Sequence, residues 1–199
     1  MNKPLILVDG SYFIHRTFRA IPLEYSPNGT PINAIDGSIY TIQKLIRRFR
    51  PSHMGVVFDH PDPTFRHLLS DAYKAHRSPP PDELLTQLPL LIENLEALGI
   101  PVIVRPGMEG DDILGTLAQI GSDSGMEVII STGDKDMAQL VNNSVVLEDS
   151  FKMIVLDTMG VVNRFGVYPS QIADWLALVG DRADGIQGVN GVGKGTATD

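Results

Sequence analysis

The sequence contains no cysteine among its 199 residues. Disulfide bonds, thiolate zinc sites and a cysteine nucleophile are therefore excluded, and the composition fits a reducing compartment. Histidine is sparse and scattered, at positions 15, 53, 60, 67 and 76, without the spacing of a histidine metal site. Any metal site in this chain must therefore rely on carboxylate oxygens.

Long hydrophobic runs are also missing. The first apolar run, Leu5 to Val8, is only four residues long and ends at Asp9. A secretory signal needs a longer apolar core, and a membrane span needs about 20 apolar residues. We therefore expect a soluble cytoplasmic protein without membrane association.

An excess of positive charge, which is typical of nucleic-acid-binding proteins, is missing too. The formal net charge is −8, from 16 basic and 24 acidic residues. The distribution softens this objection, because ten of the basic residues lie within the first 77 positions. Outside the acidic cluster described below, acids and bases are nearly balanced, and bound cations would offset the cluster itself. Nucleic acid therefore stays an eligible partner.

What the chain does contain is an alternation of strand and helix patterns. Continuous apolar runs predict buried strands, and apolar residues at helical spacing predict amphipathic helices. Strands are expected at 5–8, 56–58, 101–104, 128–130, 144–147 and 153–156, and helices at 37–50, 84–98, 111–120 and 169–179. This order predicts an α/β fold with a central, mostly parallel sheet flanked by helices.

Acidic residues follow four of these strands. Asp9, Asp59 and the pair Asp134 and Asp136 follow three strands, and Glu109-Gly110-Asp111-Asp112 lies just beyond a fourth. One such acid can simply cap a helix. Four on one sheet edge indicate a shared site, because ligands bind outside the carboxyl ends of parallel strands. Clustered carboxylates favour Mg²⁺ or Mn²⁺, and two such ions suit phosphodiester hydrolysis.

The basic segment at 65–81 offers groups that bind phosphate. Tyr73, Lys74 and Arg77 would share one helical face, and Arg66 lies seven positions before Tyr73. Lysine and arginine could hold phosphates, and Tyr73 could stack on a base. An ordinary solvated helix face is the alternative, and it is favoured when this segment is considered alone.

The glycine-rich stretch from Gly188 to Thr196 has the spacing of a Walker-A loop. Such a loop must follow a buried strand and open a helix. Residues 180–185 do not read as a strand, and only three residues follow Thr196. We therefore reject a nucleotide kinase.

Together these motifs resemble the 5′ nuclease domain at the N-terminus of bacterial DNA polymerase I, within the flap-endonuclease superfamily. The motifs are Val8-Asp9-Gly10-Ser11, Val57-Phe58-Asp59, Phe65-Arg66, Tyr73-Lys74-Ala75-His76-Arg77, Glu109 to Ala118, Ser131 to Val141 and Gly180 to Ala197. They span essentially the whole chain, and their combination is far more specific than any single motif.

The resemblance implies that the acids are shared between two metal ions. Asp9, Asp59, Glu109 and Asp111 would surround the first, and Asp112, Asp134, Asp136, Asp181 and Asp184 would form the second group, some through water. Lys74 and Arg77 would engage the scissile phosphate from a helical arch, and Arg66 and Tyr73 would contact DNA. Mg²⁺ is the expected cofactor, with Mn²⁺ as a substitute.

The resemblance also divides the chain into a catalytic core at 1–174, with its arch at 65–82, and the start of a helix-hairpin-helix-type clamp at 175–199. In that clamp Gly188, Gly191, Gly193 and Lys194 would hold duplex phosphates, with a monovalent cation at the turn. The tail departs from the family pattern at positions 183, 185, 187, 190, 194 and 195, and its second helix is incomplete. We expect a competent metal centre beside an altered, truncated clamp.

The resemblance therefore predicts a Mg²⁺-dependent 5′-3′ exonuclease or flap endonuclease. Its substrate would be DNA with a 5′ flap, a nick or a 5′ end, in primer removal and repair. We expect a monomer, and the sequence leaves open whether a polymerase domain follows in the intact protein. Two alternatives stay open: a catalytically impaired nucleic-acid-binding remnant of the same family, and a PIN-type ribonuclease, which is usually shorter and lacks the basic segment.

Overall fold

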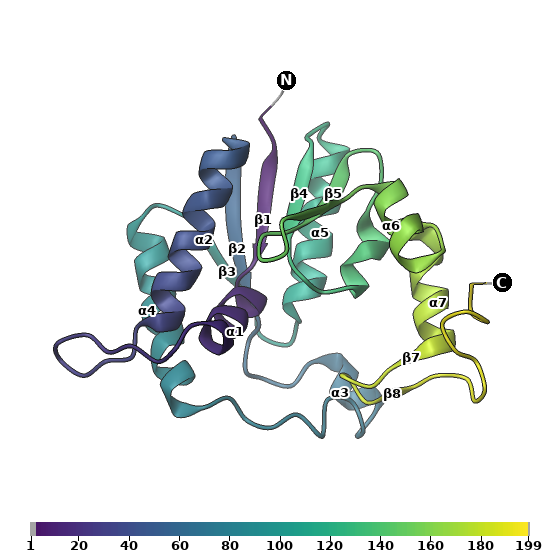
Figure 1. Cartoon of the computed structure of the whole chain (residues 1–199), viewed down its shortest axis with the longest axis horizontal. Helices are drawn as coiled ribbons and strands as arrows, with labels where there is room; N and C mark the ends of the chain where they lie inside the picture. The colour runs from purple at the N-terminus through teal and green to yellow at the C-terminus, as the bar shows by residue number, and fades with distance from the viewer. Residues whose placement is uncertain (1–2, 199) are drawn as a thin grey trace.

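The computed structural model of the chain describes residues 3–198, and a six-stranded sheet lies at its centre (Figure 1). The strands are β1 (Leu5–Asp9), β2 (His53–Phe58), β3 (Val102–Val104), β4 (Val128–Ser131), β5 (Val145–Asp149) and β6 (Ile154–Leu156). Their order is β3-β2-β1-β4-β5-β6, with every pair parallel except β5 and β6. The predicted mostly parallel α/β sheet is confirmed.

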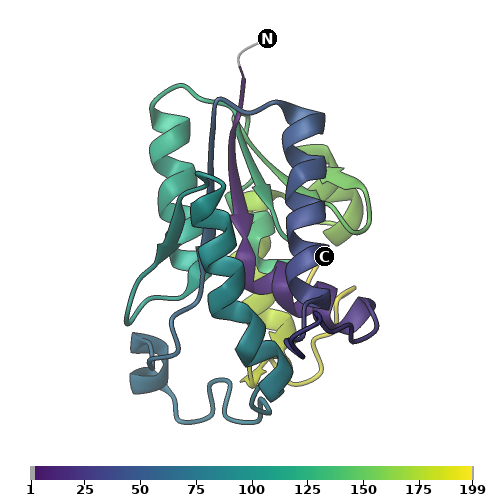
Figure 2. The ribbon, with the colours of Figure 1, turned by 90° about the vertical axis from the view of Figure 1, so that its left-hand side faces the viewer.

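Helices cover both faces of this sheet (Figure 2). One face carries α1 (Gly10–Ala20), α2 (Asn33–Phe49) and α4 (Asp82–Ala97), and the other carries α5 (Gly110–Asp123), η1 (Asp136–Leu140), α6 (Thr158–Phe165), η2 (Pro169–Gln171) and α7 (Ile172–Val179). Strand β1 packs against the helices on both faces. Ile6 and Val8 lie in the core beneath α1, α2 and α4, and Leu7 lies in the core beneath α5, α6 and α7. Burial on both faces explains the continuous apolar run of this strand.

Most predicted elements are confirmed within a few residues, but the sequence patterns predict neither α1 nor α6. Helix α1 begins at Gly10 and is rich in aromatic and β-branched residues, whose helix propensity is modest. Its helical state depends on tertiary packing, because Phe13 and Ile14 are buried in the core. Asp9 adds an N-cap by accepting a hydrogen bond from the Tyr12 N–H.

The basic segment differs most from its prediction. Only α3 (Phe65–Leu69) is helical there, and residues 71–76 form turns, so the expected helical face with Tyr73, Lys74 and Arg77 is wrong. Lys74 lies in the left-handed region, with φ of 54°. Its N–H donates to the backbone oxygen of Asp184, 2.9 Å away, instead of to the preceding turn of a helix. A long-range contact has therefore replaced the helical hydrogen bond.

The glycine-rich tail forms a small antiparallel ladder and a series of turns. Strands β7 (Gly180–Asp181) and β8 (Ile186–Gln187) pair, and residues 188–198 contain no helix or strand. Gly180 has φ of 77°, and a Cβ atom there would lie 2.3 Å from the backbone nitrogen of Gly188. The chain can therefore close this ladder only with glycine. No helix within residues 3–198 combines the length and apolar character needed to cross a membrane.

Candidate metal centre

The carboxyl ends of β1 and β4 hold the first part of the site. Asp9 is the last residue of β1 and is 9% exposed. One carboxylate oxygen accepts the Tyr12 N–H at 2.8 Å, and the other accepts the Thr132 hydroxyl at 2.7 Å. Since β1 and β4 lie side by side where the chain changes direction across the sheet, this is the expected place for a ligand.

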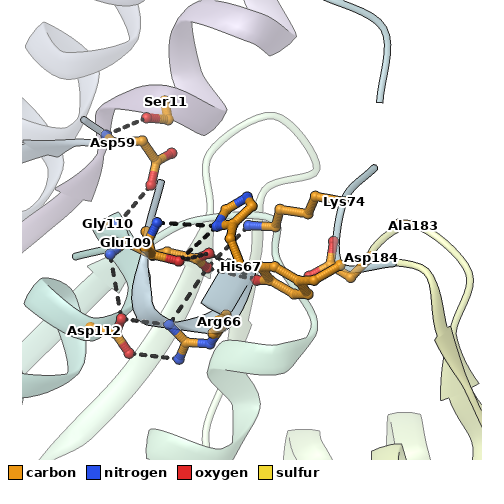
Figure 3. A network of polar contacts seen from close by, with 12 residues as sticks. Ser11, Asp59, Arg66, His67, Lys74, Glu109, Gly110, Asp112, Ala183 and Asp184 are labelled. Carbon is orange, nitrogen blue, oxygen red and sulfur yellow. Dashed lines mark hydrogen bonds and ion pairs between the residues drawn. The ribbon is translucent and has the colours of Figure 1, made fainter. Parts of the chain in front are cut away.

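Asp59 follows β2 and joins that strand to the start of α5. Its Oδ1 accepts the Gly110 N–H at 2.7 Å, and its own N–H donates to the Ser11 hydroxyl at 2.9 Å (Figure 3). A Cβ atom on Gly110 would lie 3.2 Å from the same Oδ1. The glycine therefore allows the backbone of α5 to approach this carboxylate closely.

Asp111 lies in the first turn of α5, and Asp134 and Asp136 lie beyond β4. Asp134 accepts the Asp136 N–H at 2.8 Å. Asp136 has a buried Oδ1 atom that finds no hydrogen-bond partner among the described residues. No ion pair within the described part of the chain neutralises Asp9, Asp59, Asp111 or Asp134, and Asp136 reaches only Lys135, at 4.0 Å.

Burial and mutual repulsion change the acidity of these groups. Burial raises the pKa of Asp111 to about 8, and the negative charges of Asp134, Asp9 and Asp59 add to the shift. Burial likewise raises the pKa of Asp9 and of Asp136 to about 6, with repulsion from Asp134 contributing to both. Each of these three carboxyl groups therefore holds its proton more tightly than an exposed aspartate does, because its negative charge is poorly solvated and lies near other negative charges.

The other four predicted acids each have a cationic partner. Arg66 donates to both oxygens of Asp112, at 2.7 and 2.8 Å, and this bond holds the pKa of Asp112 below its usual range. Lys135 lies 2.9 Å from Asp181, and Arg77 pairs with Asp184. Although burial opposes it, the Lys135 bond helps to keep the pKa of Asp181 low.

Glu109 has the most complete set of partners (Figure 3). It is 6% exposed and lies at the N-cap of α5. The Tyr73 hydroxyl lies 2.9 Å from both of its oxygens, the Lys74 ammonium donates at 3.0 Å, and the Thr64 hydroxyl donates at 3.2 Å. Two residues of the basic segment, Tyr73 and Lys74, and Thr64 just before it therefore contact Glu109.

The chemistry of the unpaired acids fits a hard divalent cation. Buried carboxylates that repel one another, with one oxygen that lacks a partner, are oxygen donors that Mg²⁺ or Mn²⁺ would neutralise. Within residues 3–198, however, no three acidic, histidine or cysteine side chains are already grouped as metal ligands. The donor types fit, and their side chains must move to bind a common ion.

Comparison with known proteins assigns the chain to a family. The family described as "5′-3′ exonuclease, N-terminal resolvase-like domain" matches residues 4–166. A 5′-3′ exonuclease of Aquifex aeolicus is 40% identical over 98% of this chain and 68% of its own length.

The chain belongs to the 5′-3′ exonuclease family.

Longer relatives of the chain are named DNA polymerase I. DNA polymerase I of Pseudomonas aeruginosa is 44% identical over 98% of this chain, which spans only 22% of the polymerase. The sequence-based assignment to the 5′ nuclease domain of DNA polymerase I is confirmed.

Solved structures share the exonuclease fold. T5 5′-exonuclease with bound divalent zinc has a TM-score of 0.79 and 20% identity, covering 98% of this chain and 73% of that one. The catalytic core of Rad2 in complex with a DNA substrate has a TM-score of 0.64 and 20% identity, covering 99% and 60%. The predicted fold class is thereby confirmed, and the roles of individual residues stay predictions.

Seven of the predicted site residues line one cavity of about 700 Å³. Its lining includes Arg66, Tyr73, Glu109, Asp111, Asp112, Asp136 and Asp184. Tyr73 is only 8% exposed, because its hydroxyl binds Glu109, so its side chain does not present the face that base stacking was expected to use. The predicted clamp residues lie elsewhere: Gly193 and Lys194 line a separate cavity of about 730 Å³ with Lys135, Arg164 and Trp175.

Three contributors to the site were not predicted. Thr64 donates to Glu109, Thr132 donates to Asp9, and Lys135 pairs with Asp181. Thr132 and Lys135 lie inside the acidic motif after β4, so their position at a strand end could have predicted that they contribute to the site. Thr64 carried no such signal, because its contact with Glu109 spans 45 positions.

Proposed function

We propose that the chain is the catalytic part of a Mg²⁺-dependent 5′ nuclease that hydrolyses DNA phosphodiesters at 5′ flaps, nicks and 5′ ends. The observation that carries this proposal is the group of acids without a strong ion pair, Asp9, Asp59, Asp111, Asp134 and Asp136, at the carboxyl edge of the sheet. Family membership and relatives named as exonucleases support the same reaction class.

The site residues would have two roles, binding the divalent ions and binding the phosphate. Asp9, Asp59, Asp111, Asp134 and Asp136 would hold the divalent ions. Bound there, such ions supply an activated water and offset charge on the phosphate. Lys74 and Arg77 would hold the scissile phosphate as cationic donors, and no side-chain nucleophile is needed. The remaining four predicted acids would also contribute to metal binding, although each is now paired with a basic residue of the chain. They are Glu109, Asp112, Asp181 and Asp184.

Several finer features belong to the same proposal. Mn²⁺ should replace Mg²⁺, because both prefer oxygen ligands. The turn at Gly188, Gly191, Gly193 and Lys194 would contact duplex phosphates with a monovalent cation. The protein would act as a cytoplasmic monomer, and in the intact protein a polymerase region would follow, as it does in the longer relatives.

A labelled 5′-flap DNA tests the reaction. Cleavage should require Mg²⁺ or Mn²⁺ and stop in EDTA. Asp111→Asn keeps the side-chain shape and removes the charge, so it should lower the rate by more than the roughly 10- to 100-fold typical of outer metal partners. Asp123→Asn is the matched control, since this acid lies in the last turn of the same helix and is exposed.

Two results would contradict this assignment. Cleavage by Asp111→Asn at the rate of the unmodified protein would remove Asp111 from the centre. Tight binding of flap DNA without turnover in either metal would favour the non-catalytic remnant instead.

A further inference from the structure

The base of the arch, defined here as residues 64–77, neutralises acids that were predicted to hold metal. Each of its basic residues that lies beside the site has a carboxylate partner. Arg66 binds Asp112 in a two-bond fork, Lys74 binds Glu109 at 3.0 Å, and Arg77 pairs with Asp184. The two cations that the proposed reaction needs at the phosphate, Lys74 and Arg77, are therefore both paired with acids of the site. Figure 3 shows Lys74 beside Glu109.

Tyr73 strengthens this attachment from inside the arch base. Its hydroxyl donates to Glu109, and its ring stacks edge to face with His67, with ring centres 5.3 Å apart. His67 in turn accepts a hydrogen bond from the Thr64 N–H at 3.1 Å. The buried tyrosine thus connects the only helical turn of the arch base to the carboxylate at the start of α5.

The backbone of the arch base is also docked, against the turn between β7 and β8. The Lys74 N–H donates to the Asp184 oxygen at 2.9 Å, and Arg77 Nε donates to the Ala183 oxygen at 3.3 Å. A Cβ atom on Gly185 would lie 2.6 Å from the Ala72 oxygen, so the two segments are in close contact. The arch base therefore closes one side of the acidic cavity.

A carboxylate that binds donors of the arch base cannot bind a divalent ion with its full strength at the same time. Glu109 offers about four lone-pair positions. The Tyr73 hydroxyl, the Lys74 ammonium and the Thr64 hydroxyl already lie within hydrogen-bond distance of its oxygens. For Asp112 both oxygens are engaged by the fork of Arg66. A divalent ion bound to the remaining lone pair of either carboxylate would draw on the same negative charge and repel the arch cation, so binding it weakens the contact with the arch base.

We propose that the arch base and divalent metal compete for Glu109, Asp112 and Asp184, and that Arg66 and Tyr73 are positioning residues that hold the arch docked until the exchange occurs. The inference rests on the proposed metal centre. When Glu109 and Asp184 exchange their arch partners for a divalent ion, Lys74 and Arg77 become free to bind the phosphate. Metal binding thus precedes engagement of DNA by the arch.

Thermodynamic linkage predicts whether removing the arch cations raises or lowers the affinity for metal. If two partners compete for one group, removing one must tighten the other, and couplings between sites are typically about 5- to 150-fold. A cation that only supported the shape of the site would have the opposite effect when removed, since the acids would lose their placement. The sign of the change in metal affinity therefore separates the two roles.

The test is Mn²⁺ binding by isothermal titration calorimetry, without DNA, to the full chain and to the double variant Arg66→Gln/Lys74→Gln. The variant should bind Mn²⁺ at least about fivefold more tightly. Arg48→Gln is the matched control, because it breaks an ion pair of similar length, 3.1 Å, to the buried Glu148 away from the arch. Its Mn²⁺ affinity should equal that of the unmodified chain.

A second measurement keeps the test decisive if the double variant folds poorly. Hydrogen exchange of the peptide covering residues 65–81 should become faster when Mn²⁺ is added to the unmodified chain, because the Lys74 amide leaves the Asp184 oxygen. In EDTA, Tyr73→Phe should already exchange faster in this peptide, since it lacks only the hydroxyl that binds Glu109. Peptides from β1 should not change.

Weaker or equal Mn²⁺ binding by the double variant, or slower exchange of the arch peptide with Mn²⁺, would overturn the competition. Flap cleavage by the unmodified chain in the same preparation would then leave the proposed function intact. Conversely, tighter binding by the variant with no flap cleavage by the unmodified chain would support the competition and refute the nuclease assignment.

Discussion

Two groups of acids meet in this site, and they differ in how their charge is balanced. The edge group, Asp9, Asp59, Asp111, Asp134 and Asp136, sits at strand ends and the adjoining turns and has no strong ion pair within residues 3–198. The arch-and-tail group, Glu109, Asp112, Asp181 and Asp184, is paired with Arg66, Lys74, Arg77 and Lys135. Charge on Asp9, Asp111 and Asp136 of the first group destabilises the fold, because their pKa values are raised, and charge on Asp112 and Asp181 of the second group stabilises it, because their pKa values are lowered.

The largest expected effect is the pH dependence of stability in EDTA. Asp9, Asp111 and Asp136 have folded-state pKa values of about 6, 8 and 6, all above the usual value for aspartate. The folded state therefore binds more protons than the unfolded state, and the free energy of unfolding should fall by several kcal/mol as pH rises from about 4 to 8.

Urea unfolding followed by circular dichroism across this pH range measures the fall. Added Mn²⁺ should flatten the curve, because a bound cation replaces the proton. Stability that rises with pH over the same range would show that the paired acids, whose pKa values are lowered, dominate instead.

The next effect concerns a single member of the edge group. Asp111→Asn should raise the free energy of unfolding in EDTA at pH 8 by about 2–3 kcal/mol, because it removes a buried charge that Asp134, Asp9 and Asp59 repel. Asp123→Asn should leave it within about 0.5 kcal/mol. A destabilised Asp111→Asn protein would contradict the view that this charge is unbalanced.

The arch-and-tail group should respond with the opposite sign. Glu109→Gln removes the charge that Lys74 contacts at 3.0 Å and leaves that cation facing a neutral amide. The free energy of unfolding should fall by about 1–2 kcal/mol, less than for a fully buried pair because Lys74 is partly exposed. The same urea series measures it, and a gain in stability would erase the distinction between the two groups.

The smallest expected effect tests the approach of the backbone to Asp59. In Gly110→Ala the new Cβ atom would meet Asp59 Oδ1 at 3.2 Å, while alanine favours the helix by up to about 1 kcal/mol. These terms oppose each other, so the free energy of unfolding should change by less than about 0.5 kcal/mol. A loss above about 2 kcal/mol would show that the approach to Asp59 tolerates no side chain.

Local patterns predicted the sheet and the edge group well. The apolar run Leu5 to Val8 and its neighbours identify buried strands, and parallel pairing then places Asp9 and Asp59 on one edge without further information. Helix α1 was not predicted, because its residues have only modest helix propensity and the helix is stabilised by packing against the rest of the fold. The arch base was assigned a helix because spacing alone cannot reveal that Lys74 binds Asp184.

The sequence by itself determined the fold class, the family and the gathering of acids at the sheet edge, because these follow from local periodicity and from the geometry of parallel strands. Only the tertiary structure decided which acids keep an unbalanced charge. The contact between Arg66 and Asp112 spans 46 positions, and that between Arg77 and Asp184 spans 107. No local signal encodes such pairs, since they exist only when the arch base and the tail pack against the start of α5.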